Sequence, residues 1–248
     1  MGGYAGCGFY SIVADPENYG VVIPNTLNNP AYKSAQFRSF IDFFYNFLEY
    51  VKKNRAPLDF FSWHTYAPIE HNLTMQQFTE KTLEKYGYGN VEIHLNEWNT
   101  AYEIEDRGTS YSSARAAAMM CAMHRTKMTV MCYYDARIGP SGYGGLFDPN
   151  THKPVSTYYA FKAFGELYAL GNCVESECES VYSLAAISDD GSKKAVLLAN
   201  LGEAVTIKTD LEGMKAYLVE KDVFLEEIQV DLANIEIGEN QVILLKNY

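Results

Sequence analysis

The chain has 248 residues, a formal net charge of −11 at pH 7 and a hydrophobic content of 48%. This length allows one large domain, or one medium and one small domain, with a substantial core. The acidic balance argues against nucleic acid or a membrane as the main partner, because nucleic acids and anionic membranes bind basic surfaces. The sequence shows no run of about 18 apolar residues and no signal-peptide pattern, so we expect a cytoplasmic protein.

The cysteines and histidines follow no spacing typical of a metal site, so we expect neither a metal nor a cofactor. There are five cysteines, an odd number. Cys121 and Cys132 stand in apolar stretches and are expected to be buried thiols. Cys173 and Cys178 are close enough in sequence to pair, but a reducing compartment favours free thiols.

The first two thirds of the chain alternate between predicted strands and helices. A strand end at 2–5 leads into a polar segment, in which three prolines exclude long regular elements. Apolar residues at steps of three and four predict a helix over 33–54. Thr74 and Gln77 form a capping-box pattern that predicts a second helix start, and Gly87 predicts its end. The predicted elements that follow residue 54 are strands over 58–66, 91–97 and 128–134 and helices over 74–86, 110–127 and 156–170.

This alternation indicates four parallel βα units within a first domain, residues 1–171. The pattern then changes to short β-rich runs separated by turns such as Asp-Gly and Gly-Glu. These runs predict a small antiparallel β domain over residues 172–248. They lie at about 181–187, 194–200, 204–209, 215–220, 226–230 and 241–246.

Polar side chains stand at the carboxyl ends of the predicted strands, where catalytic groups gather in parallel α/β barrels. They are His64 and Tyr66, then Asn96, Glu97 and Trp98, then Tyr134 and Asp135. Strict alternation places Glu97 on the same strand face as Ile93 and Leu95, where a carboxylate is costly to bury unless it is bonded or functional. The pattern alone also fits a solvent-exposed glutamate, a core histidine and tyrosines that serve packing.

Three segments in order resemble glycoside hydrolase family 39, the β-xylosidase and α-L-iduronidase family. They are Gly2-Gly3-Tyr4-Ala5, Leu58-Asp59-Phe60-Phe61-Ser62-Trp63-His64-Thr65-Tyr66 and Leu95-Asn96-Glu97-Trp98-Asn99-Thr100-Ala101-Tyr102. A fourth segment, from Gly144 to Phe161, is similar to the family's closing region. The resemblance implies an α/β fold, the C-terminal half of a (β/α)8 barrel, followed by a small antiparallel β-sandwich domain.

The resemblance also implies a retaining glycosidase in which Glu97 is the catalytic nucleophile. His64 corresponds to a histidine that lines the sugar subsite, and we expect Tyr66, Asn96, Trp98, Tyr134 and Asp135 to bind substrate around it. No counterpart of the family's acid/base Asn-Glu motif precedes Gly2. We therefore expect either that a second chain or a second copy completes the barrel or that the sequence is part of a longer enzyme, and in both cases weak or absent hydrolysis by this chain alone. Tyr4, Asn96 and the segment 133–135 depart from the family's residues, which leaves the sugar open among xylosides, other pentosides and uronides.

Three alternatives compete with a β-xylosidase-like enzyme. The first is a non-catalytic carbohydrate-binding or scaffold protein that keeps a glycosidase-like half barrel. The second is a related (β/α)8 glycosidase family such as the α-L-arabinofuranosidases. The third is a doubly wound nucleotide-binding protein, but no Gly-x-Gly-x-x-Gly or Walker-type loop follows a predicted strand. In the first two alternatives, as in a β-xylosidase-like enzyme, the expected partner is a small sugar or an oligosaccharide.

Overall fold

The computed structural model describes residues 2–21, 28–100, 103–138 and 145–248, which form two compact units. Unit 1 comprises Met1–Trp98 and Met123–Tyr133, and unit 2 comprises Asn99–Ala122 and Tyr134–Tyr248. Helix α5 (Ser156–Tyr168) and most of helix α4 (Ser110–His124) are thereby grouped with the β-rich region. The domain boundary expected between residues 171 and 172 stays a prediction.

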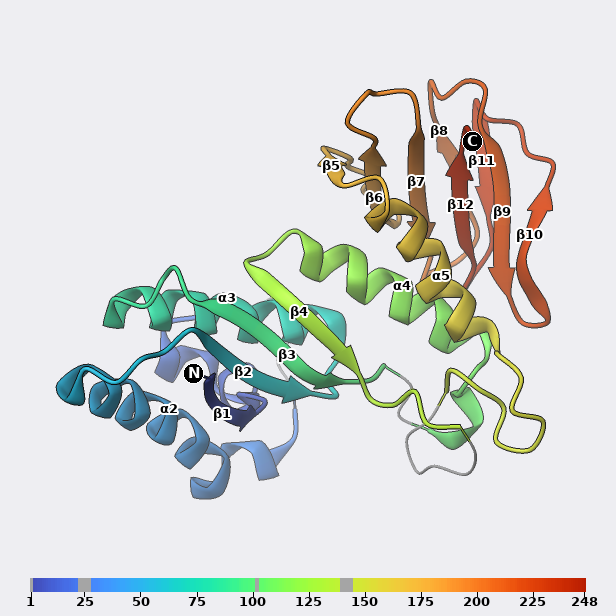
Figure 1. The fold of residues 1–248 in the computed structure, drawn as a ribbon. Coiled ribbons are helices and arrows are strands. Elements are labelled where there is room, and N and C mark those ends of the chain that lie inside the picture. The colour runs from blue at the N-terminus through green and yellow to red at the C-terminus, as the bar shows by residue number, and fades with distance from the viewer. Residues whose placement is uncertain (1, 22–27, 101–102, 139–144) are drawn as a thin grey trace. The chain divides into compact units, whose positions relative to one another are not determined.

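Unit 1 contains a four-stranded parallel sheet in the order β1-β2-β3-β4 (Figure 1). Strands that follow one another in sequence are neighbours in the sheet, so the parallel βα pattern is confirmed in this region. The strands are β1 (Gly2–Cys7), β2 (Phe60–Thr65), β3 (Glu92–Trp98) and β4 (Met128–Tyr133). The helices are α1 (Tyr10–Ala14), α2 (Ala35–Asn54) and α3 (Ile69–Tyr86), with 3-10 turns at Pro16–Tyr19 and Pro30–Lys33.

Buried aromatic rings join the helices to one face of this sheet. Phe44 of α2 stacks on Phe61 of β2 with ring centroids 4.3 Å apart. Phe9, directly after β1, stacks on Phe44 and meets the edge of Phe78 of α3, both at 5.3 Å. Phe9, Phe44 and Phe61 are fully buried. Side chains that alternate with Phe61 along β2 therefore point to the opposite face, away from the helices.

The helix predicted from Thr74 begins earlier, at Ile69, with Pro68 at its N-cap. The Thr74 hydroxyl donates to the Glu70 carbonyl at 3.0 Å, so Thr74 lies inside the helix instead of capping it. The predicted end is confirmed, since Gly87 caps the helix in the left-handed region at φ 91°.

The polar segment that follows the predicted strand end at 2–5 contains the short helix α1. Cys121 is buried as predicted, but Cys132 is exposed, so that expectation was wrong. Cys132 lies on β4, an outer strand of the sheet, where an apolar sequence run does not guarantee cover on both faces. The five cysteines, all within the described residues, form no disulfide, and this includes Cys173 and Cys178.

Unit 2 contains two antiparallel sheets, with α4, α5 and the 3-10 turn Ile104–Asp106. The larger sheet has six strands in the order β10-β9-β12-β7-β6-β5, and the smaller one pairs β11 with β8. Two of these strands, β5 (Asn172–Val174) and β11 (Asn234–Ile237), were not predicted. The others are β6 (Tyr182–Ile187), β7 (Lys194–Ala199), β8 (Val205–Lys208), β9 (Lys215–Glu220), β10 (Val223–Ile228) and β12 (Val242–Lys246).

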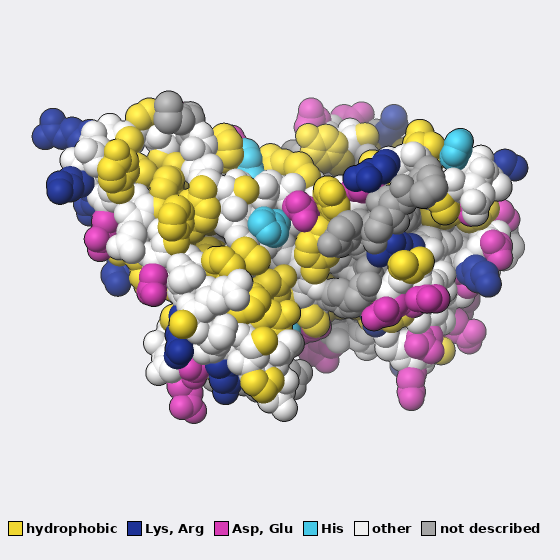
Figure 2. Space-filling view, turned by 90° about the horizontal axis from the view of Figure 1, so that it is seen from below, with side chains coloured by type: hydrophobic (Ala, Val, Ile, Leu, Met, Phe, Trp, Pro, Cys, Tyr) yellow, Lys and Arg dark blue, Asp and Glu magenta, His cyan; other side chains and the backbone are white. Residues whose placement is uncertain are grey.

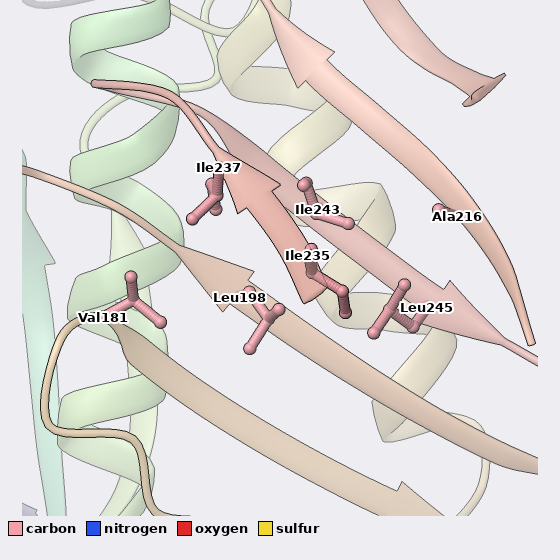
Figure 3. Packing of buried hydrophobic residues seen from close by; sticks show 7 residues of the cluster. All are labelled: Val181, Leu198, Ala216, Ile235, Ile237, Ile243 and Leu245. Atoms are coloured by element: carbon pink, nitrogen blue, oxygen red, sulfur yellow. The ribbon is translucent and has the colours of Figure 1, made fainter. Parts of the chain in front are cut away.

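A hydrophobic cluster lies between the two sheets of unit 2 (Figure 3). Ile235 and Ile237 of β11 pack against Leu198 of β7 and against Ile243 and Leu245 of β12. All five side chains are at most 5% exposed. Burial of this apolar surface holds the sheets together, in agreement with the β domain predicted for this region. None of the helices in the described part of the chain has the length and hydropathy needed to cross a bilayer.

Candidate active site

The candidate nucleophile, Glu97, lies at the carboxyl end of β3, and its orientation depends on an irregularity in the sheet. Leu95 of β3 pairs with Trp63 of β2, but the next paired residues are His64 and Glu97, so the register bypasses Asn96. Cross-strand partners point to the same side of a sheet. Glu97 therefore shares the face of His64, and the expectation that it shares the face of Ile93 and Leu95 was wrong. The unpaired Asn96 forms a β-bulge, which reverses the alternation of side chains between the two faces of β3.

Three residues with chemically active side chains form a row across this face. Cys7 of β1 pairs with His64 of β2, and His64 pairs with Glu97 of β3. All three are partly buried. Burial raises the pKa of the Cys7 thiol, and the negative charge of Glu97 raises that pKa further. The row thus places a neutral thiol, an imidazole and a carboxyl group on the face turned away from the helices.

Tyr66 joins the row from the turn between β2 and α3, because its hydroxyl donates a hydrogen bond to Oε1 of Glu97. A donor aimed at one carboxylate oxygen restricts the rotation of the carboxylate. Of the residues expected to bind substrate, the structure thus brings His64 and Tyr66 to Glu97.

Asn96 and Trp98, the neighbours of Glu97 in sequence, are placed differently. Asn96 is exposed at the bulge. Trp98 pairs with Thr65, on the face that packs against the helices, and is 1% exposed. Its ring meets Tyr133 edge-on at 5.1 Å. The structure therefore does not bring the Trp98 ring to the face of Glu97, because the same bulge that turned Glu97 outward turned Trp98 into the core.

Tyr134 and Asp135 belong to unit 2. The Tyr134 carbonyl accepts a hydrogen bond from Nδ2 of Asn99 at 2.7 Å. The Asp135 carboxylate forms an ion pair with Arg137 at 3.1 Å and accepts from the Arg137 backbone N–H, also at 3.1 Å. In this unit Asp135 thus acts as an acceptor for the Arg137 segment. Ala101 and Tyr102, which end the Glu97 motif, and Gly139–Gly144 of the glycine-rich loop lie outside the described residues.

A residue that sequence reasoning missed, Tyr10 of α1, reaches the turn that carries Tyr66. The Tyr66 backbone N–H donates to the Tyr10 hydroxyl at 3.0 Å. Burial raises the pKa of the Tyr10 phenol, so this hydroxyl stays neutral at physiological pH. Cys7 was also missed as a member of the site, since its sequence surroundings give no signal beyond its place at the end of β1. Across the described ranges, no His, Cys, Asp and Glu side chains are grouped in a way that would hold a metal ion.

No known family's sequence profile matches this chain, and no curated protein matches it in sequence. Solved structures do match. A glucosidase from Croceicoccus marinus has a TM-score of 0.64 at 16% identity, covering 81% of this chain and 56% of its own. The fold is glycosidase-like.

Two further matches agree with this glycosidase-like fold. A GH39 β-xylosidase from Caulobacter crescentus has a TM-score of 0.61 at 16% identity and covers 81% of this chain and 54% of its own. The GH51 α-L-arabinofuranosidase from Thermotoga petrophila RKU-1 has a TM-score of 0.54 at 16% identity and covers 80% of this chain and 55% of its own. The chain thus spans about half the length of these structures. At this identity the similarity is one of fold, and it includes the predicted family among others.

Proposed function

We propose that the chain carries the nucleophile half of a retaining, β-xylosidase-like glycoside hydrolase, with Glu97 as the nucleophile. The observation that carries the proposal is the Tyr66–Glu97 hydrogen bond beside His64, at the carboxyl ends of parallel strands. This is where barrel enzymes gather their catalytic groups. The glycosidase-like fold supports the same reaction class.

In the proposed reaction an oxygen of the Glu97 carboxylate attacks the anomeric carbon of the sugar. A carbon–oxygen bond to Glu97 forms as the glycosidic bond breaks, and the leaving oxygen departs with the bonding electron pair. The leaving oxygen takes a proton from a general acid, and water later hydrolyses the glycosyl-enzyme. His64 and Tyr66 flank the carboxylate, so they are the groups of unit 1 that we assign to sugar binding. Asn96 stays a candidate at the rim, and Tyr134 and Asp135 stay candidates from unit 2.

A retaining mechanism needs a second carboxyl group about 5–5.5 Å from the first. We assign this group to no residue of the chain, because none has a sequence motif that supports the role. In the described part of unit 1, β1 and β4 each pair with one neighbour, so both outer edges of the sheet are open to further strands. Val130 of β4 is 39% exposed, and Figure 2 shows other hydrophobic side chains gathered on the surface of this unit. We propose that these edges are covered, and the acid/base group supplied, by a second chain, by a second copy or by a further part of a longer chain.

The test separates the nucleophile from the missing acid. A 2,4-dinitrophenyl 2-deoxy-2-fluoro-β-xyloside has a leaving group that departs without protonation, and its fluorine slows release of the glycosyl-enzyme. We expect the intact protein to gain the mass of one fluoroxylosyl group, and peptide mapping to locate it on Glu97. Glu97→Gln, which keeps the size of the side chain but removes the nucleophile, is the matched control.

Each result decides between the readings. Labelling at Glu97 with little turnover of unactivated xylosides supports the proposal. If the xyloside does not label the protein but the corresponding α-L-arabinofuranoside does, the result would favour the related family of α-L-arabinofuranosidases. Sugar binding without a label would favour the non-catalytic carbohydrate-binding protein. Normal turnover of an unactivated xyloside by this chain alone would contradict the proposal that the acid/base group is not supplied by this chain.

A further inference from the structure

Tyr10 and the turn between β2 and α3 are joined by a hydrogen-bond network whose proton positions can be assigned. The Thr65 hydroxyl donates its single proton to Oδ1 of Asn72 at 2.8 Å and accepts from the Ala67 backbone N–H at 3.1 Å. Nδ2 of Asn72 donates to the Ala67 carbonyl at 2.9 Å, which fixes the orientation of the amide. Thr65, Ala67 and Asn72 are at most 4% exposed. The turn is therefore a buried, hydrogen-bonded structure.

These assignments determine the role of the Tyr10 hydroxyl. It lies 3.5 Å from Oγ1 of Thr65, and since the Thr65 proton is used on Asn72, Tyr10 is the donor in this long contact. Its oxygen is then free to accept from the Tyr66 backbone N–H at 3.0 Å. Tyr10 thus binds the backbone of the residue whose side chain binds Glu97.

The surroundings of Tyr10 hold its ring in place. It stacks on Tyr32 with ring centroids 4.8 Å apart and meets the edge of Phe37 at 6.0 Å. A Cβ atom at Gly8 would come within 3.1 Å of the Tyr10 ring and 3.2 Å of the His64 carbonyl oxygen. Glycine at this position therefore lets the chain after β1 pass close to β2 and bring Tyr10 to the turn.

We propose that Tyr10 is a positioning residue for Glu97, acting through Tyr66. Its hydroxyl fixes the Tyr66 backbone, and the Tyr66 hydroxyl fixes the Glu97 carboxylate in the orientation needed for attack. This inference rests on the proposed function, since it assigns a task to the Glu97 carboxylate. It adds a residue that lies outside the Glu97 and His64 motifs.

The test uses the full chain and the fluoroxyloside described above, and it measures the maximal labelling rate and the half-saturating concentration separately. Tyr10→Phe keeps the stacked ring and removes the hydroxyl. We expect its maximal labelling rate to fall on the order of tenfold with little change in half-saturation. A merely structural role would instead lower the fraction of protein that becomes labelled. Tyr32→Phe, which removes the neighbouring ring's hydroxyl, is the matched control and should label at the wild-type rate.

The double variant tests the route through Tyr66. If Tyr10 acts through Tyr66, then adding Tyr10→Phe to Tyr66→Phe should slow labelling no further than Tyr66→Phe alone. An unchanged maximal rate in Tyr10→Phe, or fully additive effects in the double variant, would overturn the inference while leaving Glu97 as the nucleophile. Absence of any label on the wild-type protein would instead overturn the proposed function.

Discussion

His64 and Glu97 are cross-strand partners and lie on the same face of the sheet because the register passes over Asn96. Without this irregularity Asn96 would follow Leu95 in the pairing and Glu97 would take the face of Leu95, among the core side chains. A bulge at the end of a strand re-aims the side chain that follows it, and such features are concentrated next to active sites. The pairing with His64 is thus the structural reason why Glu97 is available for chemistry.

The bulge predicts that alanine substitutions at two adjacent residues change the free energy of unfolding to very different extents. Leu95 is fully buried, so Leu95→Ala should lower the free energy of unfolding by about 2–5 kcal/mol. Asn96 is exposed and bypassed by the register, so Asn96→Ala should change it by less than about 0.5 kcal/mol. Urea denaturation of both variants measures the difference. A large loss in Asn96→Ala would mean that Asn96 stabilises the bulge.

Removing the Tyr66 hydroxyl should slow the attack by Glu97. Tyr66→Phe keeps the ring and deletes the hydrogen bond to Oε1 of Glu97, which leaves the carboxylate free to rotate. A hydrogen bond to a charged group contributes about 1.5–3 kcal/mol, so we expect labelling by the fluoroxyloside to slow roughly 10- to 100-fold. Tyr86→Phe, at the C-terminal end of the helix α3 that follows this turn, is the control. Equal rates in Tyr66→Phe and wild type would show that the bond has no part in catalysis.

Much of unit 1 could be predicted from local pattern. The apolar repeat of α2 and the glycine after α3 act through the chain's own geometry, and both were predicted within two residues. The position of Glu97 at a strand end and the presence of His64 on the neighbouring strand follow from the same pattern. These features need no knowledge of the partner strand.

What failed depends on partners distant in sequence. The bulge at Asn96 is a property of the pairing between β2 and β3, so period-2 alternation within β3 placed Glu97 on the wrong face. The burial of Trp98, which was expected to bind substrate, depends on the same bulge. Tyr10 was missed because its hydroxyl bonds a backbone N–H 56 positions away, and a backbone group carries no sequence signal. The exposure of Cys132 likewise depends on β4 being an outer strand of the described sheet.

Tyr4 offers a stabilising substitution. Its ring packs against Phe43, Phe47 and Phe61, while its hydroxyl is buried without a hydrogen-bond partner among the described residues. Tyr4→Phe removes this cost and should raise the free energy of unfolding by about 1 kcal/mol, seen as a higher melting temperature. Tyr50→Phe, where the side chain is 66% exposed, should leave it unchanged. A lower melting temperature for Tyr4→Phe would mean that the hydroxyl is bonded.

The burial of Tyr4 also makes the stability of the protein depend on pH, because it raises the pKa of the phenol above its ordinary value of 10.0. Above that pH the unfolded chain releases the proton while the folded chain keeps it, so proton loss favours unfolding. The stability of the wild type relative to Tyr4→Phe should therefore be constant below pH 10 and fall above it. Melting curves between pH 8 and about 11 measure this difference.

Glu166 of α5 and Lys246 of β12 form a partly buried ion pair in unit 2, with Nζ and Oε2 2.9 Å apart and side chains 28% and 17% exposed. The hydrogen bond from Lys246 holds the pKa of Glu166 below its ordinary value of 4.5. A pKa that is lower in the folded than in the unfolded chain stabilises the fold at pH values above the pKa of the unfolded chain. This contribution is lost as the pH falls through the pKa of the folded chain. Glu166→Gln should therefore cost about 1 kcal/mol at pH 7 and progressively less below pH 4.5.

The control for this pair is Lys215–Glu227, which has the similar distance of 3.0 Å but side chains 61% and 43% exposed. Solvent screens such a pair, so Glu227→Gln should leave the midpoint of urea unfolding almost unchanged at pH 7. Comparing both variants with wild type from pH 7 to about pH 3 isolates the effect of shielding. Equal losses in the two variants, or a loss in Glu166→Gln that persists at the lowest pH, would mean that the charge of Glu166 is not what stabilises the contact between α5 and β12.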